Sequence, residues 1–263
     1  MVRSCLVLCL ALGCARAEAP PRLPPRPLPS PAPPVVEVVA PEPPPPPPFR
    51  EPLPDDEIPE SASRVSGLSP AACRRELVAR ALPIEPSKRF AGGVATPMVI
   101  TGPMHGVRFV APRPPAPYGI LDCRLALALE ELAALLASHG VAALRIDSMY
   151  RPNAKLSRRR KLSQHAYGLA IDILAIELRD GRVLSVERDW HAPLPSVACG
   201  PDAVMTEPNE EAIALRNIAC AVARSGIFHH LITPSEDAAH RTHFHFDIKR
   251  PEAGRLSRGR RKR

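Results

Sequence analysis

The chain has 263 residues, of which 35 are proline, and a formal charge of +8 at pH 7. Aromatic residues make up only 4% of the sequence, which argues against the base-stacking surface of a single-strand nucleic-acid binder. No segment has both the length and the lack of charge of a membrane-spanning helix. We therefore expect no nucleic-acid partner and no helical span.

The first residues have the pattern of a secretory signal. Met-Val-Arg precedes a short apolar run from Cys5 to Cys14, and residues 15–17 read Ala-Arg-Ala, a small-x-small cleavage pattern. We therefore expect residues 1–17 to be a signal peptide and the protein to be exported to the periplasm or cell envelope. The alternative is lipoprotein processing at Cys14, which would attach the protein to the outer membrane through a lipid anchor.

Proline defines the next region, residues 18–64. Nineteen prolines lie between positions 20 and 59. Because proline fixes φ and has no amide donor, this region predicts a semi-rigid polyproline II linker without a packed core. Residues 251–263 are strongly basic and predict a disordered tail. Residues 65–250 then form the folded domain.

Within that domain, helical and strand patterns follow one another without regular alternation. Ser69-Pro70 predicts the cap and first residue of a helix through Leu82. Further helices are predicted at 121–138 and 206–225, and strands at 141–149, 169–178, 182–186, 228–232 and 243–248. Since this is not a βαβ pattern, we predict an α+β fold with a mainly antiparallel sheet flanked by helices.

The cysteines predict disulfides. Cys73, Cys123, Cys199 and Cys220 are an even number in an exported domain, which is typical of two disulfide bonds. Three pairings are open, and proximity along the chain favours Cys73–Cys123 and Cys199–Cys220. None of these cysteines has CxxC spacing, so thiolate binding of a metal is not expected.

Two segments carry the chemistry. Residues 163–172 read Ser-Gln-His-Ala-Tyr-Gly-Leu-Ala-Ile-Asp, and residues 240–247 read His-Arg-Thr-His-Phe-His-Phe-Asp. Together they supply His165, Asp172 and His245. Two imidazoles and a carboxylate are the ligand set of a catalytic zinc site, whose fourth position is left to water. We therefore predict that these three residues bind Zn²⁺.

Strand alternation predicts the neighbours of that site. In a strand over 243–248, His243, His245 and Asp247 would share one face, and the intervening phenylalanines would face the core. Asp247 would fix an imidazole tautomer from outside the ligand set, because a fourth protein ligand would close the site.

These motifs resemble the bacterial extensin-like C-terminal domain family. Leu162–Ile173 and His243–Asp247 match its Leu-Ser-x-His-Ala-x-Gly-x-Ala-Ile-Asp-Ile and His-Phe-His-x-Asp stretches. They are also similar to D-Ala-D-Ala carboxypeptidases and murein endopeptidases that share the Hedgehog/DD-peptidase fold. The resemblance implies that fold, zinc at His165, Asp172 and His245, and hydrolysis of amide bonds in peptidoglycan stem peptides or cross-links.

The chain departs from the carboxypeptidase branch in its general base. That branch has a glutamate shortly before its last zinc ligand, whereas residues 238–244 contain no acid. The spacing of His240, His243 and His245 is similar to that of murein endopeptidases, in which the first histidine of His-x-His assists catalysis. The resemblance therefore implies that His243 and His240 are catalytic. One of these two histidines would then act as the base, unless Glu236 or Asp237 does.

The resemblance also implies a substrate and leaves an alternative open. Arg151 resembles the arginine of Ser-x-Tyr-Arg segments that grips a substrate carboxylate, and Ser163 would either orient a ligand or cap a turn. The expected partner is peptidoglycan. The alternative function, favoured by the missing glutamate, is a non-catalytic zinc-containing module for wall binding or scaffolding.

Overall fold

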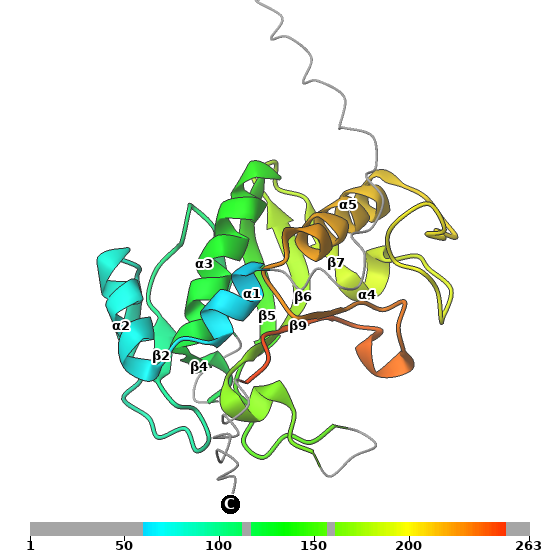
Figure 1. The fold of residues 1–263 in the computed structure, drawn as a ribbon. Helices are drawn as coiled ribbons and strands as arrows, with labels where there is room; N and C mark the ends of the chain where they lie inside the picture. The colour runs from blue at the N-terminus through cyan, green and yellow to red at the C-terminus, as the bar shows by residue number, and fades with distance from the viewer. Residues whose placement is uncertain (1–59, 112–116, 157–160, 251–263) are drawn as a thin grey trace, which may run out of the picture. The chain divides into compact units, whose positions relative to one another are not determined.

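The computed structural model describes residues 60–111, 117–156 and 161–250 (Figure 1). The predicted signal peptide, the anchor at Cys14, most of the proline-rich linker and the basic tail lie outside the described residues. The first described helix begins at Glu60, so the described fold starts before the domain boundary predicted at residue 65. Among the described helices, none has the length and apolar character to cross a bilayer.

The described elements are short helices and strands, and the α+β class is confirmed. The α-helices are α1 Glu60–Ser66, α2 Pro70–Ala79, α3 Cys123–Ser138, α4 Val186–Asp189 and α5 Glu210–Ser225. The 3₁₀ turns are η1 Pro117–Gly119, η2 Gln164–Tyr167 and η3 Ala238–His240. The strands are β1 Ile84–Pro86, β2 Pro97–Ile100, β3 Arg108–Val110, β4 Leu121–Asp122, β5 Val141–Ser148, β6 Ala170–Leu178, β7 Val183–Ser185, β8 His230–Ile232 and β9 Phe244–Asp247.

The larger sheet has the order β3-β5-β6-β9-β8, with β7 also paired to β6. All of its pairings are antiparallel except that of β3 with β5, so this sheet is mixed. In the β6–β9 pair, Asp172 lies directly opposite His245, and the flanking isoleucines of β6 lie opposite the phenylalanines of β9. Because side chains alternate along a strand, one face of the sheet is apolar and the other carries the polar residues.

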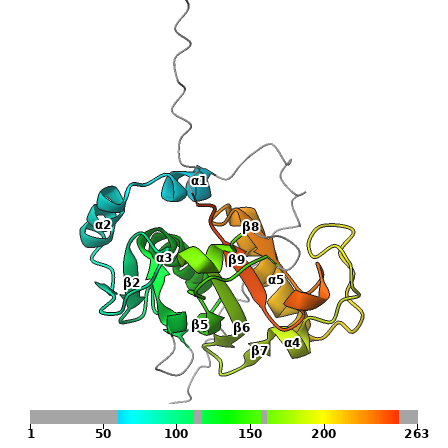
Figure 2. The same ribbon diagram turned by 90° about the horizontal axis from the view of Figure 1, so that it is seen from below.

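The apolar face contributes to the main core. Helix α3 packs on β5 and α5 packs on β7, as Figures 1 and 2 let the reader follow. The isoleucines of β6, the phenylalanines of β9 and all but one of the leucines of α3 belong to one buried cluster. Each such side chain contributes roughly 1.5–3 kcal/mol through burial of apolar surface. This core holds β6 and β9 rigidly behind the polar face.

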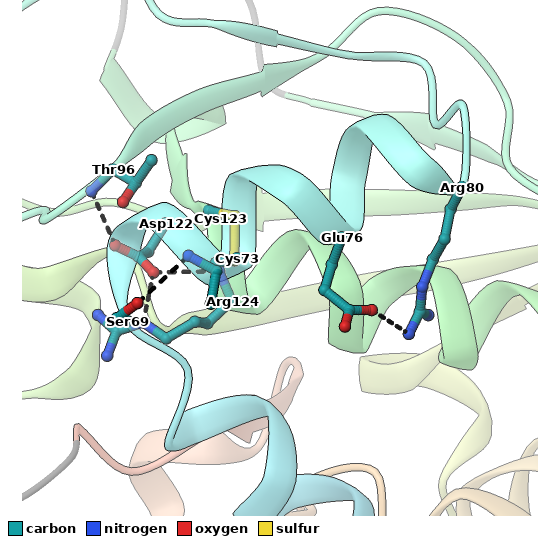
Figure 3. Close-up of a disulfide and its surroundings, with 9 residues drawn as sticks. Ser69, Cys73, Glu76, Arg80, Thr96, Asp122, Cys123 and Arg124 are labelled. Atoms are coloured by element: carbon teal, nitrogen blue, oxygen red, sulfur yellow. Dashed lines mark hydrogen bonds and ion pairs between the residues drawn. A yellow bond between two sulfur atoms is a disulfide. The ribbon is translucent and has the colours of Figure 1, made fainter.

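A second, three-stranded sheet has the order β1-β2-β4 and leads into α3. The Asp122 carboxylate accepts hydrogen bonds from the backbone N–H of Thr96 and from the backbone and side chain of Arg124 (Figure 3). Asp122 thereby caps α3, which explains why the helix begins at Cys123 instead of residue 121. The sheet itself was not predicted.

Both favoured disulfide pairings are confirmed. Cys73–Cys123 joins α2 to the first residue of α3 (Figure 3), and Cys199–Cys220 joins α5 to the segment that precedes it. That helix begins at Glu210 and not at the predicted residue 206, because the Asn209 side chain accepts a hydrogen bond from Ala212 N and caps it there.

Candidate metal centre

Three side chains converge on the polar face of the larger sheet. Asp172 and His245 come from adjacent strands, and His165 reaches them from η2. Asp172 Oδ1 lies 3.0 Å from His165 Nε2 and 2.9 Å from His245 Nδ1, and the two ring nitrogens lie 3.1 Å apart. All three residues are buried. The group could hold a metal ion, since its ligand atoms all lie within 4.8 Å of one another.

Local backbone structure fixes His165. The Ser163 hydroxyl accepts a hydrogen bond from His165 N and caps η2, so of the two roles considered for this serine the structure contains the cap. The turn ends at Gly168, which has a φ of +63°. A Cβ on Gly168 would stand 2.9 Å from Asp122 N, which donates a hydrogen bond to the Gly168 carbonyl. Only glycine fits this position without displacing the turn.

The second nitrogen of each ring determines what the group can bind. His165 Nδ1 donates to the carbonyl of Met149 at 2.9 Å, and His245 Nε2 donates to Asp247 Oδ2 at 3.1 Å. In the neutral rings, the facing nitrogens therefore present lone pairs, and the Asp172 carboxylate is only an acceptor. Three lone-pair atoms near 3 Å from one another need a positive centre between them. The donor set thus fits a metal ion, with a proton as its competitor.

Asp172 is held as an anion. Burial would raise the pKa of its carboxyl, but the contacts with His165 and His245 outweigh burial and hold the pKa well below its usual range. Its second oxygen accepts from the Ser148 hydroxyl and pairs with Arg151, each at 3.2 Å. Ser148 was missed by sequence reasoning, because only the pairing of β5 with β6 brings it to Asp172.

The two histidines of the buried group, His165 and His245, differ in basicity. Burial lowers the pKa of His165, and the opposing influence of Asp172 does not restore it. Burial acts in the same direction on His245, but its hydrogen bonds to Asp172 and Asp247 outweigh burial and raise its pKa to about 9. When no metal is bound, His245 is therefore the ring that keeps a proton at neutral pH.

Two further histidines lie on the more open side of the group. His243, just before β9, has its Nε2 3.7 Å from Asp172 Oδ1. The ring of His240 lies 5.3 Å from that of His243 and 5.8 Å from that of His245. Their side chains are 17% and 20% exposed, compared with 9% for His245, so these two rings are more accessible to solvent than the ring of His245.

The three carboxylates near these histidines, Asp237, Glu236 and Asp247, lie in different surroundings. Asp237 Oδ1 lies 2.7 Å from His240 Nδ1 and caps η3, whereas Glu236 is exposed. Asp247 contacts the outer nitrogen of His245 and also lies 2.8 Å from His230 Nδ1. His230 was missed, because nothing in its local sequence indicates a contact with the centre.

Fold and site together define an α+β protein with a buried His-Asp-His group able to hold a metal ion. The sequence profile of the family described as "Extensin-like protein C-terminus" matches residues 121–258, and the chain belongs to this family. The matched span contains all three ligand candidates. No curated protein and no solved structure matches the chain.

Proposed function

We propose that the protein is an exported, zinc-dependent peptidase that hydrolyses amide bonds in peptidoglycan stem peptides or cross-links. The observation that carries the proposal is the convergence of three lone-pair atoms from His165, Asp172 and His245. The resemblance of the two motifs to those of D-Ala-D-Ala carboxypeptidases and murein endopeptidases supports the substrate class and a Hedgehog/DD-peptidase fold.

The donor set favours zinc over harder ions. Two imidazoles and one carboxylate are typical of catalytic zinc sites, whereas Mg²⁺ and Ca²⁺ take mainly oxygen ligands. His165, Asp172 and His245 would hold the ion. When bound, zinc supplies Lewis-acid polarisation and makes water more acidic at neutral pH.

His243 is the proposed general base. Burial lowers the pKa of its imidazole, so the ring is neutral at pH 7 and can accept a proton. Its Nε2 lies 3.7 Å from Asp172 Oδ1, so a proton acceptor is available beside the three proposed ligand atoms. The same ring, once protonated, can return the proton to the leaving amine.

His240 is the proposed second catalytic group. Its Nδ1 faces the Asp237 carboxylate at 2.7 Å, which orients the ring and leaves Nε2 as the free nitrogen. With its ring next to those of His243 and His245, His240 can accept a proton or a hydrogen bond from the substrate through Nε2.

Arg151 is the proposed contact for a substrate carboxylate. One guanidinium nitrogen pairs with Asp172 at 3.2 Å, and the side chain remains 41% exposed. The remaining donors can bind an anionic group of a stem peptide next to the metal ligands. Peptidoglycan stems carry such carboxylates, which supports this substrate over a neutral peptide.

A non-catalytic zinc module that binds or scaffolds the wall is the second candidate. The lack of an acidic general base favours this candidate, because residues 238–244 contain no acid and the nearby Glu236 is exposed. In this case the zinc bound by His165, Asp172 and His245 would stabilise the domain, and His240 and His243 would contact the wall.

Incubation of the mature protein with purified peptidoglycan separates the two functions. We expect release of muropeptides that a chelator abolishes and added Zn²⁺ restores. His243→Ala should lower the rate at least 100-fold with zinc still bound, because general-base catalysis contributes about 10²–10⁴-fold. His139→Ala, at the end of α3, is the control and should retain activity. Wall binding without any product from the zinc-loaded protein would contradict the peptidase and favour the module.

A further inference from the structure

The imidazole of His230 is linked to the candidate metal centre through Asp247. The Asp247 carboxylate is buried, and each of its oxygens has a histidine partner. Oδ2 lies 3.1 Å from Nε2 of the ligand candidate His245, and Oδ1 lies 2.8 Å from Nδ1 of His230. The His230 side chain is 48% exposed, so the series of contacts runs from the ligand group to the protein surface.

Backbone pairing sets this arrangement. Strand β9 lies between β6 and β8, and His230 of β8 is directly opposite Asp247. Directly opposite residues point to the same face of a sheet. The backbone N–H of His229 also donates to the Asp247 carbonyl at 2.9 Å, which holds the two strands in this register. The contact between His230 and Asp247 is therefore built into the sheet.

The chemistry of the two contacts is directional. A carboxylate only accepts, so His230 donates through Nδ1 and His245 donates through Nε2. His245 binds a metal through Nδ1 only if its remaining ring proton stays on Nε2, where Asp247 accepts it. An Asp247 carboxylate with one unpaired oxygen could turn toward solvent and release that proton.

We propose that His230 is a positioning residue of the metal centre. It holds the Asp247 carboxylate so that the neutral His245 ring keeps its proton on Nε2 and presents Nδ1 to the metal. This inference rests on the proposed metal site, and it adds a residue that lies two contacts away from the proposed ligand His245.

Substitutions can separate the donated hydrogen bond from simple packing. Asparagine carries an N–H donor close to the position of His Nδ1, so His230→Asn should retain the contact with Asp247. His230→Leu fills similar space without a donor. His229→Leu is the matched control, because the neighbouring His229 ring uses its Nδ1 to accept a hydrogen bond from Lys249 N.

The test is the Zn²⁺ affinity of the full chain at pH 7.5, measured by competition with a chromophoric chelator. We expect His230→Leu to weaken Zn²⁺ binding about tenfold, the lower end of the effects known for residues behind metal ligands. His230→Asn and His229→Leu should stay within about twofold of the wild-type protein. Thermal unfolding of each metal-free variant verifies that it is folded.

Two results would overturn the inference: unchanged affinity in His230→Leu, or an affinity in His230→Asn as weak as in His230→Leu. Either result would leave the proposed function intact, provided that the wild-type protein binds zinc. Failure of the wild-type protein to bind zinc would overturn both proposals together.

Discussion

His245 is where a metal ion and a proton compete for the same nitrogen. Asp172 faces its Nδ1 and Asp247 faces its Nε2, so the buried ring is stabilised as a cation when the metal is absent. His165, whose pKa is lowered by burial, and the anionic Asp172 already have the protonation states that a metal needs. Binding a metal near neutral pH should therefore release a single proton from the site.

The pH dependence of metal affinity tests this competition. The pKa of His245 is raised to about 9, so the ring is protonated in the metal-free protein below that pH and must lose its proton to bind zinc. The apparent Zn²⁺ affinity should then rise about tenfold per pH unit from pH 7 to pH 8.5. Chelator competition in a pH series measures the slope. A flat profile above pH 7.5 would indicate a ring with an ordinary pKa and contradict this assignment.

Sequence patterns predicted the residues of the site that lie within a motif. They missed the residues that only the fold brings close to that motif. His165, Asp172 and His245 could be identified because their types and spacing are characteristic of a metal site. Ser148 and His230 could not, because strand pairing alone places them beside Asp172 and Asp247. The acceptor of the His165 Nδ1 proton is a backbone carbonyl, which no residue type reveals.

Among the elements, the turn η2 connects the two sheets at the metal centre. Gly168, which caps the end of η2, accepts a hydrogen bond from Asp122 N of β4 in the smaller sheet, and His165 of η2 reaches β6 and β9 of the larger one. A shift of η2 therefore moves His165, one of the three proposed metal ligands, relative to Asp172 and His245.

Gly168→Ala should consequently weaken zinc binding as well as the fold. The added Cβ would meet the Asp122 backbone at 2.9 Å, and the φ of +63° adds strain for any residue with a Cβ. We expect a loss of about 1–3 kcal/mol in the free energy of unfolding, together with weaker Zn²⁺ binding. Urea denaturation and chelator competition measure the two effects.

Gly181→Ala is the matched control for this substitution. Gly181 has a φ of +91°, but a Cβ added there would meet no atom within 4 Å. This variant should lose stability from backbone strain and bind zinc like the wild-type protein. Equal zinc affinity in both variants would show that the turn does not position His165.

The longer elements were predictable and the short ones were not. Helix α3 and strand β6 carry strong periodic patterns, and their predicted ranges overlap the observed ones closely. The strands of the smaller sheet have between two and four residues, too few for any periodicity to be recognised. The parallel pairing of β3 with β5 joins segments that are distant in sequence, so no local pattern indicates it.

Across the whole domain, the two disulfides close loops of different length. Cys73–Cys123 spans 50 residues and Cys199–Cys220 spans 21. A crosslink stabilises a protein mainly by restricting its unfolded chain, and the longer loop has the larger effect. The Cys73–Cys123 bond also fixes α2 against the start of α3, next to the smaller sheet.

Removal of the disulfide that closes the longer loop should cost more stability than removal of the other. We expect the Cys73→Ser/Cys123→Ser variant to lose about 4 kcal/mol in the free energy of unfolding and the Cys199→Ser/Cys220→Ser variant about 3 kcal/mol. Urea denaturation of the zinc-loaded proteins measures both losses. A larger loss for the pair closing the shorter loop would show that native contacts, and not loop length, determine the contribution.

Anomalous diffraction at the zinc edge from crystals of the purified protein tests the central claim most directly. We predict a single strong peak per chain within bonding distance of His165 Nε2, Asp172 Oδ1 and His245 Nδ1. The absence of a peak in crystals grown with excess zinc, with these three side chains still hydrogen-bonded to one another, would contradict the metal centre and the function proposed for it.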